Sequence, residues 1–190
     1  MMEDERTHYF LALPVPEEVQ RSINELAKLR ALQSFRSVTY IRDYHITLFF
    51  LGGVANKQLA LLYKKLPVLM HQIPAFDVQL NQAGVFGKEE QPRVLFAGVK
   101  RAQPLLDLHA AVTRGCVEAG FNKEKRPFRP HVTIAKRGKH DEPFPLQKVI
   151  DQTNHWKDVQ WRVKEVGLYA VRLGQLPRYE LKANFPLKRP

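Results

Sequence analysis

The sequence is almost without cysteine. Cys116 is the only one among 190 residues. An internal disulfide is therefore excluded, and so is a zinc site built from paired cysteines. A chain without disulfides fits a reducing compartment.

Long apolar runs are missing as well. No stretch approaches the roughly 20 residues that a membrane-spanning helix needs. The N-terminus, MMEDERTHYF, begins acidic and lacks the apolar segment of a secretory signal. With 44% hydrophobic and 26% charged residues, the composition is that of a folded globule. We expect a cytoplasmic protein with no membrane partner.

Acidic residues are few compared with basic ones. Lys and Arg number 30 against 19 Asp and Glu, which gives a net charge of +11. Residues 123–139 hold seven Lys or Arg and one Glu, so six of the eleven excess charges lie in this basic tract. A generally basic surface would explain the total, but this clustering favours an anionic partner such as RNA or a nucleotide.

The chain contains an internal repeat with an offset of 86 residues. His45-Ile-Thr-Leu and His131-Val-Thr-Ile are separated by this distance, and so are the apolar runs 9–13 and 95–99. Each run precedes an amphipathic helix, over 17–33 and 103–119, and each histidine segment precedes a further helix, over 56–70 and 145–153. Strands are expected at 76–86, 161–173 and 178–185. Chance similarity of short apolar runs is the alternative explanation.

The pattern therefore predicts two β-α-β-α-β units, the second with an extra strand. Periodicity alone allows either a parallel α/β sheet or an antiparallel α+β arrangement. A repeat implies a pseudo-two-fold axis that brings the two histidine segments together. We interpret 1–190 as one domain, with a first lobe centred on 8–86 and a second on 94–185, and with exchange of strands between lobes allowed.

Alternation along a strand places the histidine and the threonine of each motif on the same side. His45 and Thr47 point to one side, as do His131 and Thr133, while apolar residues between them point to the other. Two imidazoles that titrate near neutral pH can serve as general acid and general base. A single His-x-Thr is common and is more often structural, but two copies at equivalent positions favour catalysis. The near symmetry leaves open which histidine is the acid, and no metal, cofactor or covalent nucleophile is required.

The segments HITLFFLGG and RPFRPHVTIAKR, together with YFLALP at 9–14, resemble the two-histidine (2H) phosphoesterase superfamily. Within it they are similar to the 2′-5′ RNA ligase-like branch, the RNA 2′,3′-cyclic phosphodiesterases. The resemblance implies a bilobed α+β fold with antiparallel sheets facing across a central cleft. It also implies hydrolysis of a terminal 2′,3′-cyclic phosphate to a 2′-phosphomonoester. His45 would be the proton donor and His131 the proton acceptor, with Thr47 and Thr133 holding the phosphate.

One position departs from that branch, which often has arginine five residues after the second histidine. Here the position is Lys136 and arginine follows at Arg137. Alternation places Arg137 on the His131 side, whereas a bulge would exchange the two, so both are candidate phosphate ligands. Lysine is a point charge that cannot make the bidentate contact of arginine. Further candidates for lining the cleft or stacking a base, each with packing as the alternative, are Phe49, Tyr40 and Phe128.

Three functions remain open from the sequence. The first is an RNA 2′,3′-cyclic phosphodiesterase. The second is an enzyme with the same groups and another substrate: a 2′-5′ RNA ligase, or a phosphodiesterase for a small cyclic nucleotide or a 2′-5′ oligonucleotide. The third is a non-catalytic RNA-binding module, which the basic tract alone would support. No obligate protein partner is evident.

Overall fold

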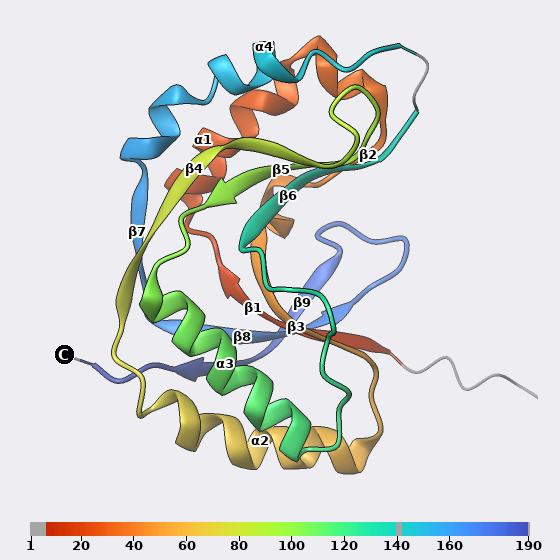
Figure 1. Ribbon diagram of the computed structural model, residues 1–190. Helices are drawn as coiled ribbons and strands as arrows, with labels where there is room; N and C mark the ends of the chain where they lie inside the picture. The colour runs from red at the N-terminus through yellow and green to blue at the C-terminus, as the bar shows by residue number, and fades with distance from the viewer. Residues whose placement is uncertain (1–6, 140–141, 190) are drawn as a thin grey trace, which may run out of the picture.

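The computed structural model describes residues 7–139 and 142–189 (Figure 1). Residues 1–6 of the acidic N-terminus, together with residues 140, 141 and 190, lie outside the described residues. The strands are β1 (His8–Pro14), β2 (Phe35–Val38), β3 (His45–Gly53), β4 (Phe76–Gly87), β5 (Pro92–Val99), β6 (His131–Gly138), β7 (Gln160–Val163), β8 (Glu165–Val171) and β9 (Tyr179–Pro186). The helices are α1 (Glu17–Asn24), α2 (Asn56–Met70), α3 (Gln103–Glu118) and α4 (Leu146–Asp151), with 3₁₀ turns η1 (Glu25–Lys28), η2 (Arg30–Ser34), η3 (Ile41–Asp43) and η4 (Asn154–Asp158).

All strand pairs between these elements are antiparallel, so the α+β alternative is confirmed and the parallel one is wrong. The strand order is β7-β4-β5-β6-β3-β1-β8-β9, with β2 beside β6. The first half of the chain supplies β4 to the group around β6, and the second half supplies β8 and β9 to the group around β3. Each group is therefore built from both halves of the sequence.

Instead of two separate sheets, the two groups are joined at one point. Ile46 of β3 pairs with Val132 of β6, and this is the single residue pair recorded between these two described strands. Figure 1 shows α2 and α3 outside the β1-β3-β8-β9 group and α1 and α4 at the opposite end of the molecule. The expected bilobed arrangement is thus seen, with the lobes continuous through β3 and β6.

Two expected elements are interrupted. The helix over 17–33 ends at Asn24 and continues as η1 and η2, separated by Leu29 in an extended conformation. These turns still bury Leu26 and Leu32, each 3% exposed, so the apolar stripe is satisfied without a continuous helix. The strand over 161–173 breaks at Lys164, because β7 pairs with β4 whereas β8 pairs with β1.

The short strand β2 and the turn η3 were not expected from the sequence. Both lie between the first helix and the first histidine, where the pattern has no clear period. Within the described part of the chain, no helix is long and apolar enough to cross a membrane.

Candidate active site

The two histidine motifs meet where β3 joins β6. The joining pair, Ile46 and Val132, is itself 86 residues apart and both side chains are fully buried. An antiparallel pair has a local two-fold axis, so this pair lies on the pseudo-two-fold axis of the repeat. His45 and His131 each precede a member of the pair and point to the opposite side of the sheet.

The register also brings each histidine near the threonine of the other motif. One step from the central pair, His45 of β3 lies toward Thr133 of β6, and Thr47 lies toward His131. All four side chains are half-buried, while the residues between them are buried. The structure thus brings together the four residues that the sequence singled out.

Both imidazoles are anchored in the same way. Nδ1–H of His45 donates to the carbonyl of Asp43 at 2.7 Å, and Nδ1–H of His131 donates to the carbonyl of Arg129 at 2.6 Å. Because a carbonyl only accepts, the proton must lie on Nδ1, which leaves Nε2 unprotonated in the neutral ring. Nε2 of His45 accepts from the Thr47 hydroxyl at 3.0 Å. Two equivalent backbone carbonyls therefore hold both rings in the same tautomer, in which Nε2 can accept a proton.

Aromatic rings support His45. Phe10 of β1 lies 4.7 Å from the imidazole centroid, and Tyr179 of β9 packs edge-on at 5.1 Å. Tyr169 of β8 stacks on Phe10 at 5.4 Å. These contacts come from three strands and restrict the rotation of the imidazole.

His131 has a comparable support on its own side. Phe86 of β4 packs edge-on against the imidazole at 4.9 Å, and Phe96 of β5 lies at 5.3 Å. The Phe96 ring covers Gly84 on the neighbouring strand, where an added Cβ would come within 2.8 Å of it. Glycine at position 84 therefore allows Phe96 to lie beside His131.

A β-bulge determines which of Lys136 and Arg137 lies on the His131 side of β6. The pairing of β5 with β6 moves from Thr133 to Ala135 in one step, so Ile134 and Ala135 are both buried. The extra residue returns Lys136 to the His131 side and turns Arg137, which has a φ of 63°, away from it. The alternation that placed Arg137 beside His131 is therefore wrong at this position.

A bulge of the same kind occurs in β3 and decides whether Phe49 lines the cleft or packs in the core. The pairing of β1 with β3 moves from Thr47 to Phe49 in one step, so Leu48 and Phe49 both enter the core. Phe49 packs near Phe121 and is 6% exposed, whereas Phe50 is 61% exposed and packs edge-on against His8. Phe49 is thus a core residue, and Phe50 is the exposed aromatic side chain next to it.

The remaining aromatic candidates lie elsewhere. Phe128 stacks on His109 of α3, with ring centroids 3.9 Å apart, and packs against the core. Phe128 is therefore a packing residue. Tyr40 is 38% exposed and precedes η3. Its role in base stacking stays a prediction.

Burial and charge lower the pKa of both histidines. Burial is the main cause for His45 and lowers its pKa to about 4, and the nearby charges of Lys136 and His131 lower it further. The pKa of His131 is lowered by burial and by Lys136. The charge of Lys136 is thus felt at both imidazoles, and its own pKa is lowered by burial and by Arg178. Such crowding of positive charge favours the binding of an anion.

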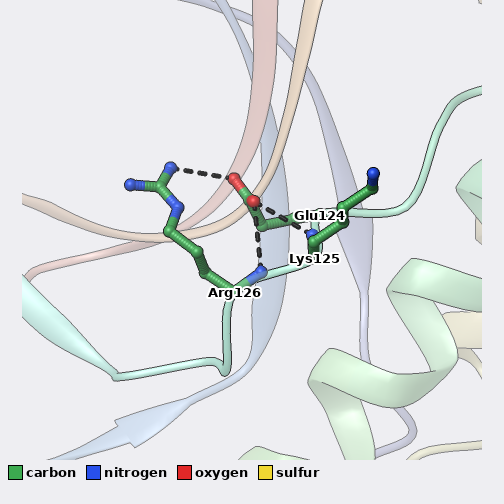
Figure 2. Close-up of polar contacts among 3 residues, drawn as sticks. All are labelled: Glu124, Lys125 and Arg126. Atoms are coloured by element: carbon green, nitrogen blue, oxygen red, sulfur yellow. Dashed lines mark hydrogen bonds and ion pairs between the residues drawn. The ribbon is translucent and has the colours of Figure 1, made fainter.

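Elsewhere in the basic tract, the charge of Arg126 is engaged by a neighbouring carboxylate. Figure 2 shows Glu124 accepting hydrogen bonds from the Arg126 guanidinium at 2.9 Å and from the backbone N–H groups of Lys125 and Arg126. These contacts lower the pKa of Glu124 to about 2. Within the tract, Lys136 is the residue whose charge acts on both histidines.

Asp43 is a functional candidate that the sequence gave no reason to select. Its side chain is 4% exposed and accepts hydrogen bonds from the backbone N–H groups of Arg178, at 2.9 Å, and Tyr179, at 3.1 Å. Its carbonyl holds His45. Its partners lie 135 and 136 residues away, so no local pattern could have revealed them. In the described residues, no three His, Cys, Asp or Glu side chains gather as metal ligands would.

Known proteins match this arrangement over most of the chain. The model of the 2′-5′ RNA ligase superfamily matches residues 15–175. An RNA 2′,3′-cyclic phosphodiesterase of Bacillus subtilis is 32% identical over 98% of this chain and 100% of the relative. Among solved structures, TT0787 of Thermus thermophilus covers 96% of this chain and 98% of its own, with 25% identity and a TM-score of 0.77.

Escherichia coli LigT, in a complex with 3′-AMP, has the same fold, with a TM-score of 0.75 and 24% identity over 96% of this chain and 99% of its own. The family match covers most of the chain, and the paired His-x-Thr motifs lie within it. The chain belongs to the 2′-5′ RNA ligase superfamily.

Proposed function

We propose that this protein hydrolyses RNA ends carrying a 2′,3′-cyclic phosphate to 2′-phosphomonoesters. The observation that carries the proposal is the pair of identically anchored imidazoles on one side of the β3–β6 junction, with Lys136 beside them. The Bacillus subtilis relative named RNA 2′,3′-cyclic phosphodiesterase, which is matched over its full length, supports it.

The reaction needs two proton transfers, and each histidine supplies one. Nε2 of His131 takes a proton from water as the water oxygen attacks phosphorus. Nε2 of His45 gives a proton to O3′ as the P–O3′ bond breaks. Water has then been added across that bond, and the product carries a 2′-phosphate and a 3′-hydroxyl. This division of roles follows the family resemblance, because the anchoring is the same for both rings.

The phosphate itself prepares His45 for its role. At a pKa of about 4, His45 is neutral near pH 7 and cannot donate. A bound anion beside the imidazole favours its charged form and raises its pKa. Lys136 attracts that anion, and the hydroxyls of Thr47 and Thr133 can donate to the non-bridging oxygens. Substrate binding therefore makes His45 a proton donor.

The decisive experiment is a product assay on an RNA oligonucleotide that ends in a 2′,3′-cyclic phosphate. We expect His45→Ala and His131→Ala each to lower the rate by about 10²–10⁴-fold with the fold intact. His155→Ala, which removes a half-exposed imidazole elsewhere, is the matched control and should leave the rate unchanged. The rate should persist in EDTA. Full activity in either active-site variant, or a 3′-phosphate product, would contradict the mechanism.

Two related alternatives are separated by the same assay. Joining of the end to a 5′-hydroxyl RNA would indicate ligation, and salt-sensitive binding without turnover would indicate a binding module. A cytoplasmic location is part of the proposal, and a single buried thiol, Cys116, agrees with a reducing compartment.

A further inference from the structure

The connection between β8 and β9 is fixed to the active site. This hairpin, residues 172–178, joins two strands of the group that contains β3 (Figure 1). The backbone N–H of Arg178 donates to the Asp43 carboxylate at 2.9 Å, and the carbonyl of Arg178 accepts from the N–H of Arg172 at 2.8 Å. Both polar groups of the Arg178 backbone are therefore held.

The anchor of this hairpin is also the anchor of His45. The carbonyl of Asp43 holds Nδ1 of His45, while its carboxylate holds the N–H groups of Arg178 and Tyr179. Tyr179 in turn packs edge-on against the His45 ring. The backbone of Arg178 is thus one residue from a side chain that touches the imidazole, and its position is set by the same aspartate.

The charge of Arg178 extends the positive region beyond Lys136. Arg178 is solvent-exposed, and its charge lowers the pKa of Lys136. Lys136 in turn lowers the pKa of both histidines. Within the described residues, neither Lys136 nor Arg178 takes part in an ion pair with a carboxylate.

We propose that Arg178 binds the phosphodiester on the 5′ side of the terminal nucleotide, so that the enzyme prefers an RNA end to a nucleoside 2′,3′-cyclic phosphate. The inference rests on the proposed function and specifies its substrate class. With the cyclic phosphate at the histidines and Lys136, the next phosphate lies one nucleotide along the chain. A guanidinium suits it because it makes paired hydrogen bonds to two phosphate oxygens.

The test compares three substrates that share the same cyclic phosphate. They are a nucleoside 2′,3′-cyclic phosphate, a dinucleotide with one internal phosphodiester, and the same dinucleotide with a neutral methylphosphonate at that linkage. The wild-type enzyme should have a kcat/KM about tenfold or more higher for the charged dinucleotide than for the other two. A hydrogen bond to a charged group is worth about 10–100-fold in such a comparison.

Arg178→Ala should remove this preference. The ratio of kcat/KM for the charged dinucleotide to that for the nucleoside substrate should fall about tenfold or more, and Arg178→Lys should restore part of it. The slope of log kcat/KM against log salt for the charged dinucleotide should become less steep by about 0.7, as expected for one phosphate contact on a single strand. Arg114→Ala, on the exposed side of α3, removes the same charge and should change neither measure.

The outcomes separate this inference from the proposed function. Absence of turnover of every cyclic phosphate would refute the function itself. Turnover with the same substrate ratio in the wild type and Arg178→Ala would leave the function standing and refute the role of Arg178. An equal loss on all three substrates would likewise overturn it, because Arg178 would then act on the cyclic phosphate or on the hairpin.

Discussion

The lowered pKa values of the two histidines predict an acidic pH optimum. The pH profile of kcat/KM reports the pKa values of the acid and the base in the free enzyme. Its maximum lies midway between the two pKa values, whichever histidine is the acid. Because burial and Lys136 lower both pKa values, the maximum must lie below 6.5, the ordinary value for histidine.

His45 sets an upper limit on the position of this maximum. Its pKa is lowered from 6.5 to about 4, and that of His131 lies below 6.5. The midpoint is therefore below about 5.3. A pKa lowered from 6.5 to about 4 corresponds to about 3 kcal/mol against the charged form of His45. A bound phosphate offsets part of this cost, so the kcat profile should lie at higher pH than the kcat/KM profile.

The assay is the initial rate on a 2′,3′-cyclic phosphate substrate from pH 4 to 9 at constant ionic strength. Lys136→Met tests the direction of the shift, because removal of the positive charge raises the pKa of both histidines. Its kcat/KM maximum should move to higher pH even as the rate falls. A wild-type maximum at or above pH 6.5, or a Lys136→Met maximum at lower pH, would refute the electrostatic reasoning.

Two further predictions concern the bulge in β3 and the anchor Asp43. Phe49→Ala should lower the free energy of unfolding by about 3–5 kcal/mol, because it empties a core site, whereas Phe50→Ala should change it by less than about 1 kcal/mol. Equal losses in urea denaturation would show that the bulge is absent. Asp43→Ala should lower the free energy of unfolding by about 2–4 kcal/mol, because two backbone N–H groups lose their acceptor. It should also weaken the preference for the charged dinucleotide, as Arg178→Ala does. Unchanged stability together with an unchanged substrate ratio would contradict the role of Asp43.

The bulges mark where a strand pattern stops predicting side-chain direction. Alternation correctly placed His45 and Thr47 on one side, and His131 and Thr133 likewise, because these residues precede the irregularity. Beyond the bulge, each side chain lies on the side opposite to the one that regular alternation predicts. Phe49 therefore lies in the core and Lys136 lies beside the histidines. A bulge has no fixed sequence signal, but two apolar residues in a row, Leu48-Phe49 and Ile134-Ala135, are what such a site requires.

The register of the two apolar runs, 9–13 and 95–99, could not be predicted from the sequence. The sequence aligned 9–13 with 95–99 at the offset of 86, but Leu11 lies opposite Phe49 and Leu95 lies opposite Ala135, an offset of 84. A slip of two residues keeps every side chain on its side of the sheet, so a short apolar run contains nothing to exclude it. The two histidine motifs can be aligned without such a slip, because their polar residues identify the register.

What the sequence could not reveal is how the equivalent residues are brought together. The repeat makes His45 and His131 equivalent, but their proximity depends on the pairing of Ile46 with Val132. In the same sheet β4 joins one group and β8 and β9 join the other, and this arrangement depends on contacts across the whole chain. Asp43 follows from the same exchange, since its carboxylate meets the hairpin only because β9 lies in the group of β3. The two histidine motifs are thus a local signal in the sequence, whereas the contacts of Asp43 and Arg178 are a consequence of the topology.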